Sequence, residues 1–257
     1  MPRFAANLGY LFTEHPFLER FAAARRAGFD AVEFAAPYAH PAADIAARLA
    51  DNDLECILIN LPMGERRKGD IGIACRPGRE REFREGVARG IGYAHALGVR
   101  KLNCISGVAM AGEDPAALRE ILVDNLRFAA REFKSAALDL VVEPLNDVVD
   151  APGFLVPRAA AMIEVIDAVG EDNVGLQLDI YHAAMMGDDP QRLLTECFPR
   201  IRHLQFADVP GRGEPGTGGL DFPRLFAHID RLGYPGRVSA EYRPTLPTER
   251  TLHWLTA

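Results

Sequence analysis

Four oxygen-bearing side chains in the second half of the chain are spaced by about one structural repeat. They are Glu143, Asp179, Gln205 and Glu241, at intervals of 36, 26 and 36 residues, and each ends a short apolar segment. If these segments are parallel strands of one barrel, their ends meet at a single mouth. Converging carboxylates need a cation or shared protons, and hard oxygen ligands suit Mg²⁺ or Mn²⁺. The pattern predicts a divalent metal site built from these four residues.

A simpler interpretation is that each acid only caps a helix N-terminus or pairs with an arginine. For one acid at a strand end, this interpretation is about as good as a catalytic one. The repetition of the pattern on consecutive segments favours a shared site.

Three further residues are assigned to substrate binding. His182 follows Asp179 closely in Asp-Ile-Tyr-His, where a turn after the strand would point its ring into the mouth, although a lone histidine is more often structural. Asn60 ends an earlier apolar segment in the same way. Arg212 lies in a glycine-rich loop, which we interpret as a mobile loop over the site whose arginine binds a carboxylate or phosphate. A solvated turn with an exposed arginine is the alternative.

The same loop, from Gly211 to Gly216, formally matches G-x-G-x-x-G. Pro215 interrupts it, and no helix opens directly after it, so the match does not predict a dinucleotide site. His203 lies two residues before Gln205 on the same face of its strand, one layer deeper, and is not counted as a ligand. No nucleotide cofactor is expected.

The elements that must position these residues follow from the hydrophobic pattern. A short apolar segment followed by a helical pattern recurs about every 30 residues, with no linker between repeats. Eight continuous apolar segments are typical of buried parallel strands. They are Phe4–Leu8, Ala31–Phe34, Cys56–Leu61, Lys101–Cys104, Leu140–Glu143, Val174–Leu178, Ile201–Phe206 and Arg237–Glu241.

The segments between the strands have helical apolar spacing, and several end in glycine, as at Gly28, Gly98 and Gly233. Eight alternations in 257 residues predict an α/β fold with a single (β/α)₈ barrel domain over residues 1–257. A doubly wound sheet would have fewer strands and a glycine-rich first turn, and the first turn here, beginning at Gly9, is not glycine-rich.

Composition narrows the possible partners. With a net charge of −7, the chain as a whole has no excess of positive charge that would attract nucleic acid or an anionic membrane. No segment has the roughly 18 apolar residues of a membrane span. The four cysteines are widely spaced and form no C-x-x-C pair, so we expect them to be reduced and buried. With no leader-like segment at the start, a cytoplasmic location is expected.

Taken together, several segments resemble the hydroxypyruvate isomerases of the xylose isomerase-like barrel superfamily along nearly the whole chain. They are Arg3-Phe-Ala-Ala-Asn-Leu, Gly28-Phe-Asp-Ala-Val-Glu-Phe, Asn60-Leu-Pro, Gly72-Ile-Ala-Cys-Arg-Pro-Gly-Arg-Glu, Val142-Glu-Pro-Leu-Asn, Gln177-Leu-Asp-Ile-Tyr-His, His203-Leu-Gln-Phe-Ala-Asp, Arg212-Gly-Glu-Pro-Gly-Thr-Gly and Glu241-Tyr-Arg-Pro. The resemblance implies interconversion of hydroxypyruvate and tartronate semialdehyde, with Glu143 and Glu241 as the proton-transferring pair. Related sugar epimerases usually have a histidine where Gln205 stands, which favours magnesium over zinc here and leaves the need for a metal open.

Three other functions are alternatives to this one. The N-terminal third also resembles 2-oxo-tetronate isomerases, whose substrate is one carbon longer. A metal-dependent abasic-site endonuclease would need clustered histidines and a basic surface, and a non-catalytic sugar-acid-binding barrel would be expected to lack one of the strand-end acids. The expected partner is a small anionic hydroxy-carbonyl substrate, and a homo-oligomer, dimer or tetramer, is possible for barrels of this kind.

Overall fold

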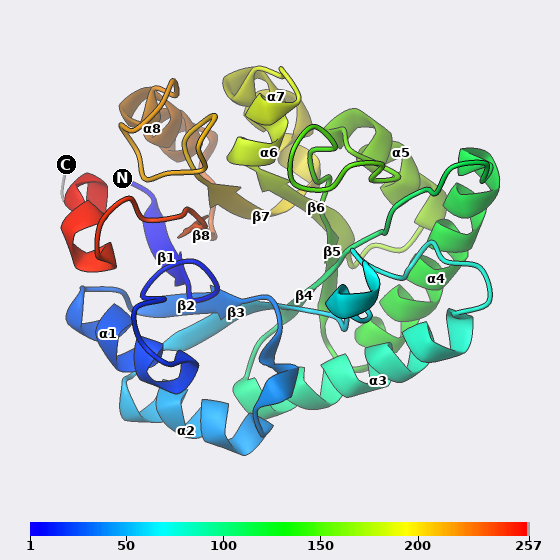
Figure 1. The fold of residues 1–257 in the computed structure, drawn as a ribbon, viewed down its shortest axis with the longest axis horizontal. Helices are drawn as coiled ribbons and strands as arrows, with labels where there is room; N and C mark the ends of the chain where they lie inside the picture. Colours follow the sequence, from blue (N-terminus) through cyan, green and yellow to red (C-terminus); the bar gives the residue numbers. More distant parts are fainter. Residues whose placement is uncertain (256–257) are drawn as a thin grey trace.

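The computed structural model describes residues 1–255, which form a closed barrel of eight parallel strands in chain order (Figure 1). Every strand predicted from the hydrophobic pattern is present, with ends shifted by at most one residue. The strands are β1 (Arg3–Asn7), β2 (Ala31–Phe34), β3 (Glu55–Asn60), β4 (Lys101–Cys104), β5 (Asp139–Val142), β6 (Val174–Asp179), β7 (Ile201–Phe206) and β8 (Arg237–Ala240). Pairing of β1 with β8 closes the barrel, so the predicted (β/α)₈ fold is confirmed.

Helices surround the barrel on the outside (Figure 1). They are α1 (Arg20–Arg26), α2 (Ala42–Asp51), α3 (Glu80–Leu97), α4 (Pro115–Ser135), α5 (Ala159–Val169), α6 (Ile180–Met185), α7 (Pro190–Cys197) and α8 (Phe222–Leu232). Short 3₁₀ turns lie at Phe17–Glu19, Pro37–Ala39, Arg66–Lys68, Phe198–Arg200, Thr248–Thr251 and His253–Leu255. No helix formed by residues 1–255 is both long and apolar enough to cross a membrane.

The helix ends follow local sequence rules. Gly98 and Gly233 terminate α3 and α8 in the left-handed region, with φ of 68° and 71°, as the sequence predicts. Aspartates begin several helices by accepting hydrogen bonds from the first backbone N–H groups. One of these is Asp179, which ends β6 and begins α6 directly, so that strand and helix share a single residue at the barrel mouth.

Apolar side chains fill the space between the barrel and the helices. An aromatic cluster joins β1, β7, α8 and the C-terminal turn, with Phe4 and Phe206 both about 5 Å from the Trp254 ring (5.0 and 5.1 Å between centroids). The four cysteines are buried and free, as expected. This apolar shell holds the strands rigidly, so the side chains at their ends have fixed positions.

Candidate active site

The four predicted metal-site residues all lie at the C-terminal end of the barrel. Glu143 directly follows β5, Asp179 ends β6, Gln205 lies near the end of β7, and Glu241 directly follows β8. All four are buried, and Glu241 is the most exposed of them at 9%. Their common end follows from the parallel arrangement of the strands.

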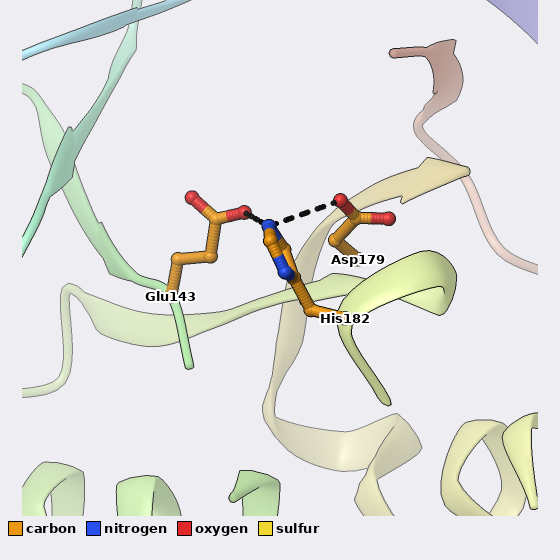
Figure 2. Close-up of side chains that lie close together, drawn as sticks. All are labelled: Glu143, Asp179 and His182. Atoms are coloured by element: carbon orange, nitrogen blue, oxygen red, sulfur yellow. Dashed lines mark ion pairs between the residues drawn. The ribbon is translucent and has the colours of Figure 1, made fainter. Parts of the chain in front are cut away.

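Glu143, Asp179 and His182 form a compact group (Figure 2). The His182 Nε2 atom lies 3.9 Å from Glu143 Oε1 and 3.6 Å from Asp179 Oδ2. Asp179 Oδ1 accepts the backbone N–H of Tyr181 at 2.9 Å and so caps α6. The capping role considered from the sequence is therefore real for Asp179, but it uses one oxygen only and leaves the other facing His182.

The hydrogen bonds of Asn146 determine the tautomer of His182. Asn146 Oδ1 accepts the backbone N–H groups of Val149 and Asp150 at 3.0 and 3.2 Å, which fixes the orientation of the amide. The amide nitrogen then lies 2.8 Å from His182 Nδ1, and the backbone N–H of Asn146 donates to the same atom at 3.2 Å. Since two donors point at Nδ1, that atom is the acceptor and the proton is on Nε2. Burial lowers the His182 pKa to about 3, so the ring is neutral.

Arg212 enters the same site from the loop between β7 and α8. One amino group donates to Glu241 Oε2 at 2.6 Å and lies 3.4 Å from Asp179 Oδ2, and the other is 3.2 Å from Asp150 Oδ1. The guanidinium carbon lies over the rings of Tyr10 and Tyr181, 4.6 and 4.7 Å from their centroids. The alternative of an exposed arginine in a solvated turn is therefore wrong.

The loop that carries Arg212 is hydrogen-bonded to the end of the barrel, and its mobility stays a prediction. Asp208, just after β7, accepts the backbone N–H groups of Gly216, Gly218 and Leu220 at 2.8 to 3.1 Å. The glycines serve this turn: a Cβ at Gly218 would lie 2.0 Å from the Val209 carbonyl oxygen. The loop therefore supports the Arg212 side chain inside the site.

Buried negative charge dominates the electrostatics. Burial, together with the neighbouring Asp179, raises the pKa of Glu143 to about 8. Burial raises the pKa of Asp179 to about 6 although Arg212 opposes the shift. Burial also raises the pKa of Glu241, Arg212 opposes this, and Glu143 adds to it. Four carboxyl groups, those of Glu143, Asp150, Asp179 and Glu241, thus interact with one cation, Arg212. The excess negative charge favours binding of a further cation or retention of protons.

Below these residues lies a buried hydrogen-bond network centred on Glu33. Its Oε1 accepts from Asn7 at 2.9 Å and from Gln205 at 2.6 Å, and its Oε2 is 2.6 Å from His203 Nε2. Burial opposes ionisation of Glu33, but His203 and the two amides lower its pKa. His203 is thus a partner of Glu33 in a deeper layer, in agreement with its exclusion as a ligand.

The network also orients two of the predicted residues. Gln205 Oε1 accepts from Gln177 Nε2 at 2.6 Å, so its amide oxygen already has a donor, and its role as a metal ligand stays a prediction. Asn7 bridges the two acids by donating to Glu241 Oε1 at 2.8 Å as well as to Glu33. Asn60 is buried at the end of β3, and its amide lies 3.6 Å from Met63 Sδ. No hydrogen bond within residues 1–255 joins the Asn60 side chain to the other predicted residues.

Several residues of the site were not identified from the sequence. Their side chains contact Glu241, Arg212, His182 or Gln205 and include Asn7, Tyr10, Asn146, Asp150, Gln177 and Tyr181. Asn7 lies at the end of β1, so the strand-end rule could have found it. Asp150 and Tyr10 lie in loops without periodicity, and no local signal marks them.

The donor set fits a hard divalent cation. Glu143 Oε1 and Asp179 Oδ2 face the same point, and both belong to carboxyl groups whose burial is unfavourable when ionised. The buried Gln177 Oε1 and Asn103 Oδ1 atoms have no hydrogen-bond partner among the described residues. His182 does not fit as a ligand through Nε2, because that nitrogen carries the proton. The carboxylates would therefore hold the ion, and His182 would lie beside it.

Comparisons with known proteins identify the family. A family model described as xylose isomerase-like TIM barrel matches residues 21–257. The chain belongs to the xylose isomerase-like TIM barrel family. Hydroxypyruvate isomerase of Escherichia coli (strain K12) is 44% identical over 255 residues, 99% of this chain and 98% of that protein. The 2-oxo-tetronate isomerase of Cupriavidus necator is 40% identical, again covering 99% of this chain and 98% of that protein.

Solved structures give the same fold. A crystal structure from Brucella melitensis, described as an AP endonuclease of family 2, has a TM-score of 0.96 at 40% identity and covers 100% of this chain and 98% of that one. An L-ribulose 3-epimerase has a TM-score of 0.78 at 26% identity, covering 100% of this chain and 86% of that one. The predicted family and the predicted barrel are both confirmed.

Proposed function

We propose that this chain is an isomerase that interconverts hydroxypyruvate and tartronate semialdehyde (2-hydroxy-3-oxopropanoate). The observation that carries the proposal is the pair of buried glutamates at the ends of β5 and β8, beside a neutral histidine donor and a buried arginine. The names of the hydroxypyruvate isomerase relatives support this substrate. No redox cofactor is required, because the reaction only moves protons between neighbouring carbon and oxygen atoms.

The reaction needs one acid and one base. A proton leaves C3 of hydroxypyruvate, an enediolate forms, and a proton is added to C2; the hydroxyl proton on the C3 oxygen is lost and one is gained on the C2 oxygen. Burial raises the pKa of both carboxyl groups, and Asp179 adds to the shift of Glu143 as Glu143 adds to that of Glu241. The metal-free pair therefore retains a proton at neutral pH. Such a pair supplies both roles, and we assign them to Glu143 and Glu241.

The hydrogen-bond partners suggest which glutamate begins as the base. Arg212 donates to Glu241 at 2.6 Å and favours its ionised form, whereas Glu143 accepts a neutral amide N–H from Asn103 at 2.8 Å. We therefore propose that Glu241 begins as the base in the hydroxypyruvate direction. The proton lies on Glu143 in the metal-free protein, and a cation bound at Glu143 would displace it.

His182 and Arg212 are proposed to contact the substrate. The Nε2–H of His182 points into the gap between Glu143 and Asp179 and would donate to an enediolate oxygen, where developing charge is best stabilised. Arg212 would bind the substrate carboxylate, and Asn60 remains a proposed polar contact at the mouth. A neutral imidazole suits this role because it donates a hydrogen bond without giving up its proton.

We further propose that Mg²⁺ or Mn²⁺ binds at Glu143 and Asp179, with Gln205 and Glu241 as further ligands. Such a cation would polarise substrate oxygens and neutralise the excess carboxylate charge. The compact group of buried acids supports the site, and the amide oxygen of Gln205 favours a hard ion over zinc. A cytoplasmic location and a homo-oligomeric state also remain proposals.

A four-carbon substrate is the second candidate, since 2-oxo-tetronate isomerases are among the relatives at 36 to 40% identity.

Endonuclease activity is disfavoured by the net charge of −7 and by the positions of the histidines. Within residues 1–255 the buried histidines are His182 and His203, which contact different acids. That arrangement is not the histidine cluster expected of such an enzyme.

The proposal is tested by assaying purified protein with hydroxypyruvate and with four-carbon 2-oxo acids, with and without chelator. We expect a higher kcat/KM for hydroxypyruvate and loss of activity on chelation that Mg²⁺ or Mn²⁺ restores. A higher kcat/KM for a four-carbon acid would assign the second function. The absence of isomerisation with both substrates in the metal-loaded protein would overturn the proposal.

A further inference from the structure

The loop after β5 contains two polar residues that the chemistry proposed above does not use, Asn146 and Asp150. Asn146 is fully buried, and all its polar side-chain atoms are engaged: the oxygen by two backbone N–H groups, the nitrogen by His182 Nδ1 at 2.8 Å and Asp150 Oδ2 at 2.6 Å. Rotating the amide by 180° would break all four contacts. The side chain is therefore locked with its donor toward His182.

Asp150 joins Asn146 to the other substrate-facing groups. Its Oδ2 accepts from Asn146 and from the Tyr181 hydroxyl at 2.9 Å, and its Oδ1 is 3.2 Å from the Arg212 guanidinium. The Tyr181 ring in turn packs against Arg212, with the guanidinium carbon 4.7 Å from the ring centroid. One carboxylate thus holds the amide that faces His182, the tyrosine and the arginine.

We propose that Asn146 and Asp150 are positioning residues that present His182 as an Nε2–H donor and Arg212 as a fixed cation to the same substrate. Asn146 acts on His182, because a donor facing Nδ1 excludes the tautomer with the proton there. Asp150 pairs with the Arg212 guanidinium and so holds that cation in a fixed position. Neither residue touches the reacting atoms. The role in turnover rests on the proposed isomerase function, whereas the tautomer does not.

This arrangement also separates His182 from a metal ligand. A histidine bound to a cation through Nε2 carries its proton on Nδ1, and a partner that fixes this tautomer is normally an acceptor such as a carboxylate or carbonyl. Here the partner is a donor. Asn146→Asp would replace the side-chain donor 2.8 Å from Nδ1 with an acceptor, and only the longer contact with the backbone N–H, at 3.2 Å, would remain. The proton is therefore expected to move to Nδ1.

The tautomer is measured by ¹⁵N NMR of histidine-labelled full-length protein, with Mg²⁺ and after chelation, using His182→Gln to assign the signals. We expect a protonated Nε2 and an unprotonated Nδ1 in both conditions, and a protonated Nδ1 in Asn146→Asp. Asp147→Asn, in the same loop, is the matched control and should not change the tautomer. A protonated Nδ1 in the unsubstituted protein would overturn the proposal without any variant, even if Asn146→Asp failed to fold.

Turnover provides the second readout. Asn146→Asp should lower kcat about tenfold or more, because it removes the hydrogen-bond donor at His182 Nε2. Asp150→Asn should leave the His182 tautomer unchanged and raise KM for hydroxypyruvate about tenfold, because it releases Arg212. The positioning role of Asn146 would be overturned if a folded Asn146→Asp variant had a protonated Nδ1 and an unchanged kcat. The role of Asp150 would be overturned if Asp150→Asn had an unchanged KM. If the unsubstituted protein shows the expected tautomer but no isomerisation, the proposed function fails and the tautomer assignment stands.

Discussion

Replacing Glu143 by glutamine should stabilise the metal-free protein at high pH while removing its activity. Glu143 is buried, and burial with the nearby Asp179 raises its pKa to about 8 from an ordinary value of 4.5. Between these pH values the native state keeps a proton that the unfolded state has released. The free energy of unfolding of the unsubstituted protein must therefore fall as pH rises through this window.

The size of the effect follows from the same values. The difference between about 8 and 4.5, at about 1.4 kcal/mol for each pH unit, corresponds to about 5 kcal/mol once pH exceeds 8. Glutamine is never ionised and keeps an oxygen that can accept from Asn103, which donates to Glu143 at 2.8 Å. We expect Glu143→Gln to be more stable than the unsubstituted protein by about 3 to 5 kcal/mol at pH 9 and by less than about 1 kcal/mol at pH 5.

Urea unfolding in the presence of chelator measures this difference. The single tryptophan, Trp254, is buried in the aromatic cluster and reports unfolding by fluorescence. Glu132→Gln, on the exposed surface of α4, is the control and should have the same stability as the unsubstituted protein at both pH values. Saturating Mg²⁺ at pH 9 should stabilise the unsubstituted protein more than Glu143→Gln, because binding offsets the buried charge.

An equal stability difference between Glu143→Gln and the unsubstituted protein at pH 5 and pH 9 would contradict this prediction. That result would mean that Glu143 ionises in the folded protein as easily as in the unfolded chain. The loss of activity would then have to be explained without a retained proton.

The remaining tests concern the buried network, the second glutamate and the cation. Glu33→Ala removes the acceptor of three buried hydrogen bonds and should lower the free energy of unfolding by about 3 to 5 kcal/mol in urea. Glu132→Ala should change it by less than about 0.5 kcal/mol, and equal stability of the two variants would contradict the network. Glu241→Gln should lower kcat for hydroxypyruvate at least about 100-fold, and adding Glu143→Gln should cost little more; near-normal turnover would leave Glu241 a structural acid. Chelation should abolish activity and Mg²⁺ restore it, whereas full activity without metal would place charge stabilisation on the protein alone.

Much of the architecture could be predicted because its signals are local. Buried parallel strands are continuous apolar segments, and helices show a different period, so eight strands were found to within one residue at each end. Strand ends are also local features, and the rule that parallel strands end at one mouth brought Glu143, Asp179 and Glu241 to the same end of the barrel.

The roles of single side chains depended on contacts between residues far apart in the chain. The sequence allowed two interpretations of Arg212, an exposed residue in a turn and a ligand-binding residue. Only the structure shows that it is buried, in contact with Glu241 at 2.6 Å and packed between two tyrosines. Nothing in its glycine-rich surroundings indicates these partners. Loops have no period, so their path is set by what they pack against.

The sequence by itself determined the barrel and the strand-end acids, because periodicity and strand polarity depend on neighbouring residues. Its motifs carried the resemblance to the family. Only the tertiary structure decided the protonation and hydrogen-bond partners of those acids. His203 meets Glu33 across 170 residues of sequence, and Asn7 meets Glu241 across 234. A pKa or a tautomer depends on burial and on the donors within about 3 Å, and barrel closure brings these distant residues together.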